Sequence, residues 1–189
     1  MKKFISVLLA ITLLMSVCLC LASCKNDDKT DASNEKVTEL TEQDVRILIE
    51  DNLDCYFMFY VAPLSDNSYQ GDDGYYETDG TYIKTYDELE KLVNDTYTKK
   101  TAQKLLEYPS SDSPLYKNVD NSIYVKPEVI TPVDYDVIWD DTYTIDMKQI
   151  SDTQYALTFT AYDFDSNDYV AVGDIVFEDG KWRFDDIIY

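Results

Sequence analysis

Carboxylates are the side chains best suited to chemistry in this sequence, because acids are abundant and histidine is absent. The 189 residues include 37 Asp and Glu, 16 Lys and Arg, and no His. Histidine-based triads, Cys-His dyads and His-containing zinc sites are therefore excluded. Neighbouring acids could in principle divide the roles of general acid and general base. Such pairs occur at Asp72-Asp73, Asp140-Asp141 and Asp185-Asp186.

The paired acids make a weak case for an enzyme. Consecutive residues of a strand point to opposite faces, so Asp140-Asp141 and Asp185-Asp186 are not expected to converge. In a chain with 37 acids, such pairs also follow from composition alone. No P-loop, dinucleotide-binding fingerprint or G-x-S-x-G motif occurs. The sequence therefore predicts a protein that is not an enzyme and uses no cofactor.

Two acidic segments partly match the calcium-binding loop of EF-hands. In the segment of residues 163–174, positions one, three, five and twelve of the EF-hand loop are occupied by Asp163, Asp165, Asn167 and Asp174. Asp168 stands where that loop requires glycine, and the earlier match, at residues 66–77, is wrong at positions five and eight. Neither segment has a predicted helix on both sides. We expect no metal site, and a simple turn between two strands at "DFDSND".

The earlier segment, residues 65–80, is expected to be an exposed loop. It is rich in Gly and Asp and also carries Tyr69, Tyr75 and Tyr76. Exposed tyrosine is favoured at recognition surfaces. The residues predicted to contact a partner are Asp66, Asp72, Asp73, Tyr75, Tyr76 and Glu77.

The beginning of the chain has the pattern of a secretory signal. Two lysines precede an apolar run from Phe4 to Leu21. "LASC", which ends at Cys24, resembles the lipobox of bacterial lipoproteins, in which the cysteine is diacylated and becomes the first residue of the mature protein. An uncleaved transmembrane anchor is the alternative, because the run is almost long enough to span a bilayer. We predict a signal peptide at residues 1–23, lipidation of Cys24, and a location on the outer face of the cytoplasmic membrane.

Residues 24–40 are polar, lack aromatic side chains and are predicted to form a flexible tether. Removal of the signal takes away two lysines and no acid, so the net charge changes from −21 to −23. Such a surface repels nucleic acid and anionic headgroups, and it favours a basic partner or metal ions. Cys55 is left without a disulfide partner, and its apolar neighbours predict a buried, inert thiol.

Helices are predicted in the first half of the domain. Thr41 and Asp44 have the spacing of a capping box. An apolar stripe follows, formed by Val45, Ile49, Leu53, Tyr56 and Tyr60. Phe57 to Phe59 are expected to be deeply buried, and Pro63 ends the helix. Thr85 and Glu88 predict a second capping box, and a third helix restarts near Asp95 or Thr98 and ends before Pro109.

Short segments rich in β-branched and aromatic residues follow, and Asp179-Gly180 predicts a hairpin between the last two. This order predicts a single α+β domain at residues 41–189, with the N-terminal helices packed on one face of a curved antiparallel β-sheet.

The order of these elements resembles the IseA-like DL-endopeptidase inhibitor family, whose members are exported proteins, often lipoproteins, of Gram-positive bacteria. The resemblance is carried by the segments "GTYIKTYDELEKLVNDTYTKKTAQKLLE", "LYKNVDNSIYV" and "FEDGKWRFDDI". Its residues are Tyr82, Tyr86, Leu89, Leu92, Leu105, Leu106, Tyr124, Gly180 and Trp182. The closing "DGKWRFDDI" is also common in cone-shaped, nuclear-transport-factor-2-like domains, which host many activities.

The resemblance implies a protein that binds and blocks hydrolases that cut between D- and L-amino acids in peptidoglycan stems. No inhibitory residue is carried over individually. The first hypothesis is therefore a protein-binding module that inhibits or regulates a basic cell-wall hydrolase, an autolysin of the DL-endopeptidase type. Two alternatives stay open. One is a small-ligand-binding or enzymatic cone-shaped domain, and the other is a calcium-dependent adhesion or scaffold module.

Overall fold

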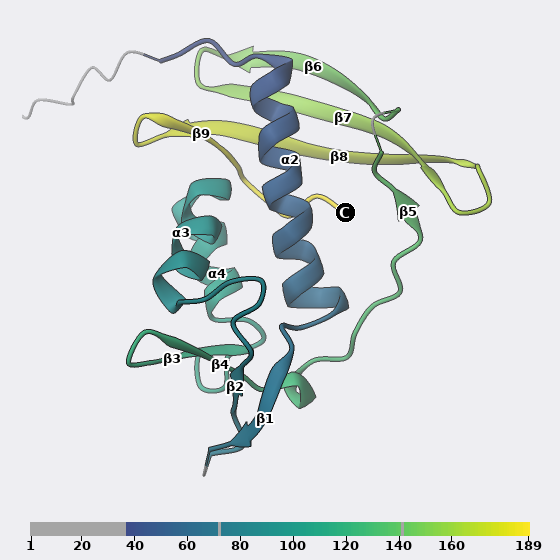
Figure 1. Ribbon diagram of the computed structural model, residues 1–189. Helices are drawn as coiled ribbons and strands as arrows, with labels where there is room; N and C mark the ends of the chain where they lie inside the picture. Colours follow the sequence, from purple (N-terminus) through teal and green to yellow (C-terminus); the bar gives the residue numbers. More distant parts are fainter. Residues whose placement is uncertain (1–36, 72, 141) are drawn as a thin grey trace, which may run out of the picture. The chain divides into compact units, whose positions relative to one another are not determined.

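The computed structural model describes residues 37–71, 73–140 and 142–189 (Figure 1). Three α-helices occur in the first half of this part of the chain, with two short strands between the first and the second helix. The other strands follow the helices, and all strands belong to antiparallel sheets. The predicted α+β class is thus confirmed. The predicted signal peptide, Cys24 and most of the tether lie outside the described residues. Among those described, no helix combines the length and the apolar character needed to cross a membrane.

Helix α2 (Glu42–Tyr56) begins at the predicted capping box. Asp44 N–H donates to Thr41 Oγ1 at 3.2 Å, and Thr41 N–H donates to Asp44 Oδ2 at 2.9 Å. The inward stripe of α2 includes Val45, Ile49 and Cys55, all fully buried. A π-helical turn, η1 (Phe57–Val61), continues the helix. Phe57 is 44% exposed, so the expectation that this whole turn is deeply buried is wrong at that residue.

Helices α3 (Tyr86–Thr96) and α4 (Lys99–Leu106) are joined by a sharp connection through Tyr97 and Thr98. Thr85 Oγ1 accepts from Glu88 N–H at 3.3 Å, as predicted. The Glu88 carboxylate, however, accepts from Lys84 N–H at 2.9 Å and not from Thr85. The second capping box is therefore only half formed.

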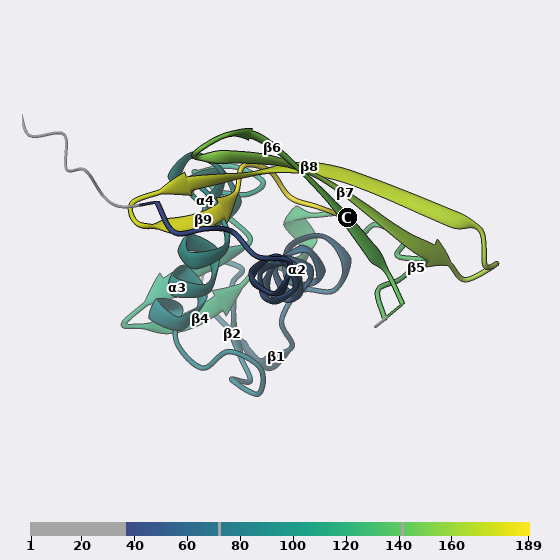
Figure 2. The ribbon, with the colours of Figure 1, turned by 90° about the horizontal axis from the view of Figure 1, so that it is seen from above.

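The larger sheet comprises β5 (Val137–Ile138), β6 (Thr144–Ser151), β7 (Gln154–Asp163), β8 (Asp168–Glu178) and β9 (Lys181–Phe184). Its strands are antiparallel in the order β5-β7-β8-β9, and β6 also pairs with β7. Leu157, Phe159 and Ala161 of β7 alternate inward and are buried against the helices. Figure 2 shows the twist of this sheet and α2 lying against one face of it.

The predicted hairpin at the end of the chain is confirmed. Asp179 and Gly180 connect β8 to β9 with φ angles of 48° and 78°. Positive φ at both central residues is the conformation of a type I′ turn, which Asp-Gly favours. The other predicted turn, at "DFDSND", is also present, between β7 and β8.

A second, smaller sheet corrects the prediction of a single sheet. Its strands are β1 (Asp66–Gln70), β2 (Tyr76–Thr78), β4 (Ser122–Val125) and β3 (Tyr116–Val119), in that order. Residues 65–80 were predicted to be a loop, yet they supply β1 and β2. The reason is tertiary, because Tyr76 and Glu77 pair with Val125 and Tyr124, far along the chain.

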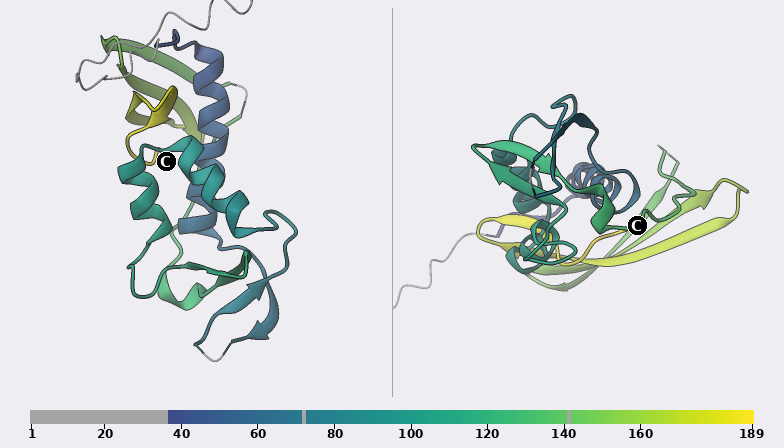
Figure 3. Two further views of the ribbon diagram at one scale, coloured as in Figure 1. Left: turned by 90° about the vertical axis from the view of Figure 1, so that its left-hand side faces the viewer. Right: turned by 90° about the horizontal axis from the view of Figure 1, so that it is seen from below.

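One buried cluster connects the two sheets and the helices. Figures 1 and 3 show α3 and α4 between the larger and the smaller sheet. Short backbone contacts join these layers, including Thr98 N–H to Phe184 O at 2.9 Å. The indole N–H of Trp182 donates to Thr38 O at 2.8 Å and ties the segment before α2 to β9.

Candidate partner-binding surface

The acidic residues predicted to contact a partner do not form one exposed loop in the structure. Asp66 and Glu77 lie on the neighbouring strands β1 and β2, where Asn67 Nδ2 donates to Glu77 Oε2 at 3.1 Å. Asp73 lies between these strands, and its carboxylate forms an ion pair with Lys117 of β3. Asp72 lies outside the described residues, as does the side chain of Tyr69. The segment is thus folded onto β3 and β4 rather than extended into solvent.

The ion pair changes the electrostatics expected of this segment. The hydrogen bond from Lys117, more than any other contact, holds the pKa of Asp73 below its usual value. Lys126 Nζ also lies 3.3 Å from Asp73 O. The charge at this position is therefore partly neutralised within the protein, and a partner would meet a weaker negative field than the composition suggests.

Tyr75 is buried, so the expectation of an exposed tyrosine at this position is wrong. Its side chain is 5% exposed, and its hydroxyl donates to Pro114 O at 2.6 Å. Lys117 Nζ and Lys126 Nζ lie 5.3 Å and 5.4 Å from the ring centroid, within the range of cation–π contacts. Tyr75 anchors the segment to the smaller sheet. Tyr76, on β2, is only half-buried.

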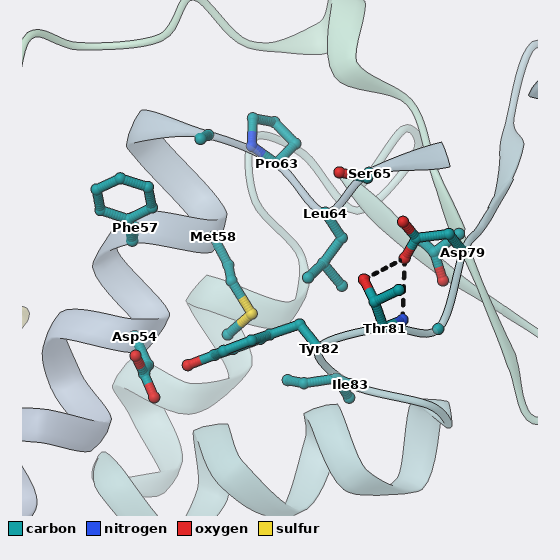
Figure 4. A pocket seen from close by; sticks show the side chains of 13 residues that line it. Asp54, Phe57, Met58, Pro63, Leu64, Ser65, Asp79, Thr81, Tyr82 and Ile83 are labelled. Carbon is teal, nitrogen blue, oxygen red and sulfur yellow. Dashed lines mark hydrogen bonds between the residues drawn. The ribbon is translucent and has the colours of Figure 1, made fainter. Parts of the chain in front are cut away.

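A groove of about 340 Å³ lies beside this segment, between η1 and the chain that follows β2 (Figure 4). Two of its aromatic side chains are open to solvent, since Phe57 is 44% exposed and Tyr82 is 59% exposed. Its carboxylates belong to Asp54 and Asp79. The remaining lining residues are Met58, Ala62, Pro63, Leu64, Ser65, Thr78, Gly80, Thr81 and Ile83.

The first wall of the groove is positioned by a buried tyrosine of β3. The Tyr116 hydroxyl donates to Met58 O at 2.7 Å and accepts from Leu64 N–H at 3.0 Å. Ala62 N–H donates to Phe57 O at 2.8 Å, closing the wide π-turn. Single π-turns occur frequently at functional sites. Here the turn ends α2 with Phe57 directed outward and Met58 inward.

The second wall is a tight turn after β2. Asp79 Oδ1 accepts from Thr81 N–H at 2.9 Å and from Thr81 Oγ1 at 2.7 Å. These hydrogen bonds lower the pKa of Asp79. Gly80 has a φ of +65°, in the left-handed region that a residue with a side chain rarely adopts. The turn directs Tyr82 across the groove toward Asp54 (Figure 4).

Asp54 and Tyr82 form the polar end of the groove. Partial burial and then the hydrogen bond with the Asp54 carboxylate raise the pKa of the Tyr82 hydroxyl above its usual value. No lysine or arginine is among the described residues that line the groove. Carboxylates beside open aromatic faces attract a guanidinium or an ammonium group. The groove is therefore suited to a basic side chain of a partner.

Asp54, Phe57 and Tyr82 were not in the predicted set of contact residues. Phe57 was expected to be buried with its neighbours, and Tyr82 was named among the residues that carry the family resemblance. The helical spacing contained a signal, because Phe57 falls off the apolar stripe that passes through Leu53, Tyr56 and Tyr60. The exposure of Tyr82 depends on the turn at Gly80, which the local sequence marks only weakly.

The other acidic candidates have local roles. Asp163 Oδ1 accepts from Asn167 N–H, and its Oδ2 accepts from Asn167 Nδ2, both at 2.8 Å, which closes the turn between β7 and β8. Asp185 and Asp186 follow β9, so their predicted placement on a strand is wrong, and Asp141 lies outside the described residues. In the part of the chain that is described, no three Cys, Asp or Glu side chains gather as metal ligands would.

Cys55 is buried as predicted, and burial raises the pKa of its thiol to about 12. A thiol that stays protonated is a poor nucleophile.

The sequence matches no family model and no curated protein. Its function is therefore inferred from its own residues and from the resemblance of its motifs.

Proposed function

We propose that this chain is a lipid-anchored protein-binding module of the cell envelope that inhibits a basic peptidoglycan DL-endopeptidase. The observation that carries the proposal is the groove of Asp54, Phe57 and Tyr82, which presents two open aromatic rings and a carboxylate beside an acidic pair of strands. The mechanism is steric, because a protein bound at or beside a hydrolase cleft excludes the peptidoglycan stem from it.

Charge supports a basic partner. The mature chain carries a net charge of −23 after loss of the signal. A strongly anionic surface accelerates association with a cationic protein, and this acceleration falls as salt increases. Asp66 and Glu77 at the neighbouring strands would contribute to this steering. Asp73 would contribute less, because Lys117 already pairs with it.

In this proposal, the aromatic residues make the contacts that slow dissociation of the complex. Tyrosine and other large aromatic side chains dominate binding energy at interfaces when a partner covers them. Tyr82 and Phe57 flank a space of about 340 Å³, which can hold one long side chain. A lysine or arginine of the hydrolase would place its alkyl stem against Met58 and Leu64 and its charge at Asp54.

The predicted compartment supports such a partner. The resemblance of "LASC" to a lipobox favours a location outside the cytoplasmic membrane, where wall hydrolases act. The resemblance to the IseA-like inhibitor family supports the same assignment through the order of its elements. Diacylation of Cys24 provides stable attachment, since two acyl chains hold a protein at a membrane where one does not.

A small cationic ligand is the second candidate, favoured by the size of the same groove. Pockets for small molecules begin at about 300 Å³, and this one measures about 340 Å³. Because both rings are exposed, the groove is open to solvent. An open groove is better suited to a side chain of a bound protein than to a ligand that must be enclosed. Ligand binding would be seen as saturable calorimetric heat with arginine or lysine derivatives at micromolar concentration.

Surface plasmon resonance with a purified basic DL-endopeptidase tests the proposal. Tyr82→Ser and Phe57→Ser remove the open rings, and each should speed dissociation about tenfold, corresponding to about 1–2 kcal/mol for an anchor. Asp54→Asn should weaken binding and reduce its salt dependence. Ile150→Ser is the matched control, because Ile150 is also exposed but lies at the end of β6.

If the wild-type chain does not bind the enzyme, the proposed function is wrong. If it binds with all three groove variants unchanged, the function stands and the groove is not the contact site.

A further inference from the structure

Strand β8 has one edge that is paired along only part of its length. On one side it pairs with β7 from Asp168 to Val176. On the other side β9 pairs only with Ile175 to Glu178. Across residues 37–71, 73–140 and 142–189, no strand pairs with the Asp168–Gly173 half of β8 on that side. Figure 1 shows this half extending beyond the end of β9.

The backbone groups of this open edge point away from β7. Asp185 N–H donates to Asp174 O at 3.0 Å, so the backbone groups of Asp174 face the β9 side. Backbone groups alternate between the two sides of a strand. Those of Val172 and Val170 therefore point to the same side as those of Asp174, beyond the last residue of β9. Such a row of donors and acceptors is a template for another strand.

The C-terminal segment leaves this edge open. After Asp185 the chain turns beneath the inner face of the sheet, where Ile188 packs on Gly173. The Tyr169 hydroxyl, on the inner face, donates to Tyr189 O at 2.5 Å. Residues 186–189 thus cover the inner surface of β8, and among the described residues no backbone hydrogen bond joins them to Val170 or Val172.

The outer face next to the edge is apolar and exposed. Val170 is 57% exposed and Val172 is 70% exposed. Tyr162 of β7 and Ile138 of β5, which pair with each other, add exposed apolar area on the same face. Natural sheets usually protect an open edge with lysine or proline. "DYVAVGD", residues 168–174, contains neither, whereas β6 at the opposite edge carries Lys148.

Charge distinguishes a second copy of this chain from a basic segment of another protein as the strand that could pair here. Asp185 already occupies the place opposite Asp174, so an added strand can pair only with Asp168–Gly173. The net charge of −21 opposes the association of two copies. A segment with a basic residue opposite Asp168 would meet that carboxylate favourably.

We propose that the Asp168–Gly173 edge of β8 binds an extended segment of a partner protein as an added antiparallel strand. The segment has two apolar residues at alternating positions, which cover Val172 and then Val170, and a lysine or arginine two positions after the second of them, opposite Asp168. Backbone hydrogen bonds supply affinity, and the alternating side chains supply specificity. This surface is separate from the groove, and the inference does not depend on the proposed hydrolase.

The test uses the peptide Thr-Val-Thr-Val-Thr-Lys, capped at both ends, and the full chain in detergent, with binding measured by calorimetry. A matched peptide with Glu in place of Lys should bind at least about tenfold more weakly. In the proposed pairing, the second and fourth residues of the peptide exchange hydrogen bonds with Val172 and Val170 of β8. N-methylation of those two amides should abolish binding, whereas N-methylation of the third residue should preserve it.

Two variants of the chain locate the site. Val172→Lys adds a charge at the open edge and should weaken binding about tenfold or more. Ile150→Lys places the same charge at the end of β6 and should leave binding unchanged. Both positions are exposed, so both variants should keep the thermal midpoint of the wild type. As a second readout, independent of these variants, peptide binding should slow hydrogen exchange at the amides of Val170 and Val172.

The inference is overturned if the peptide does not bind at millimolar concentration, or if the Lys and Glu peptides bind equally. It is also overturned if Ile150→Lys weakens binding as much as Val172→Lys, which would place the peptide on β6. A concentration-dependent dimer that Val172→Lys dissociates would show that the occupant is a second copy.

Discussion

Asn52 and Ile188 pair as two neighbouring strand residues would, although one contributes a side chain and the other its backbone. Asn52 Nδ2 donates to Ile188 O at 2.6 Å, and Asn52 Oδ1 accepts from Ile188 N–H at 2.9 Å. The Tyr97 hydroxyl also donates to Asn52 Oδ1, at 2.9 Å. All three residues are buried. This polar cluster fixes the C-terminal segment against α2 and holds Ile188 on β8.

Asn52→Leu should destabilise the fold by about 2–4 kcal/mol, because the substitution keeps the volume but leaves the buried N–H and C=O of Ile188 unpaired. Urea denaturation measures the change. Asn94→Ala is the control, since its side chain donates only to Glu90 O on an exposed face, and it should cost less than about 0.5 kcal/mol. Equal stability of Asn52→Leu and the wild type would contradict the structural role given to this cluster.

Gly173→Ala should also destabilise the protein, by about 1–3 kcal/mol, through overpacking. A Cβ at position 173 would overlap the Cδ1 atom of Ile188. Shortening Ile188 should relieve this contact, so Gly173→Ala combined with Ile188→Val should cost less than the sum of the two single changes. A double-mutant cycle of unfolding free energies measures this coupling. Strict additivity would show that the two residues do not meet.

The features that could be predicted from the sequence depend on contacts within about four residues. The Thr41 and Asp44 capping box is one, and the Asp179-Gly180 turn is another. Each is determined by local side-chain chemistry, so no knowledge of the tertiary structure was needed. The α+β class followed from the same local patterns, taken in order along the chain.

The smaller sheet and part of the candidate site could not be predicted in this way. The β2 strand forms because Tyr76 pairs with Val125, and nothing near Tyr76 marks that partner. Tyr75 is buried because Pro114, Lys117 and Lys126 surround it. Its Gly- and Asp-rich neighbours suggested an exposed loop, but distant strands determined the outcome. Composition was therefore misleading about the conformation of this segment, and it also overstated the negative field at Asp73, which pairs with Lys117.

Asp51→Asn should stabilise the protein at neutral pH. Partial burial, then repulsion from Asp54 and Glu50, raises the pKa of Asp51 in the folded state. A carboxylate whose pKa is raised in the folded state destabilises the fold when it is ionised. This destabilisation is present at pH 7, and it disappears as the pH falls to about 4, near the pKa of the unfolded chain.

Thermal midpoints at pH 7 and about pH 4 measure this effect, and the advantage of Asp51→Asn should shrink between them. Asp112→Asn removes the same charge from an exposed turn and corrects for the general relief of net negative charge. An advantage for Asp51→Asn that is the same at both pH values would contradict the account.

Cys24→Ala should release the protein from the membrane or leave it as an unprocessed precursor, because the proposed diacylated cysteine is lost. Cell fractionation and the mobility of the protein on gels measure this. Cys20→Ala, within the predicted signal, should stay processed and membrane-bound. If Cys24→Ala behaves like the wild type in both respects, the chain is not anchored as a lipoprotein.

The central claim is that this protein blocks a cell-wall hydrolase. The most direct measurement is the rate at which a purified basic DL-endopeptidase cleaves peptidoglycan as the concentration of this chain increases. The account predicts that the wild-type chain reduces the rate to near zero at saturation, and that Tyr82→Ser requires about tenfold more protein for the same effect. A cleavage rate that stays constant at saturating wild-type protein would contradict it.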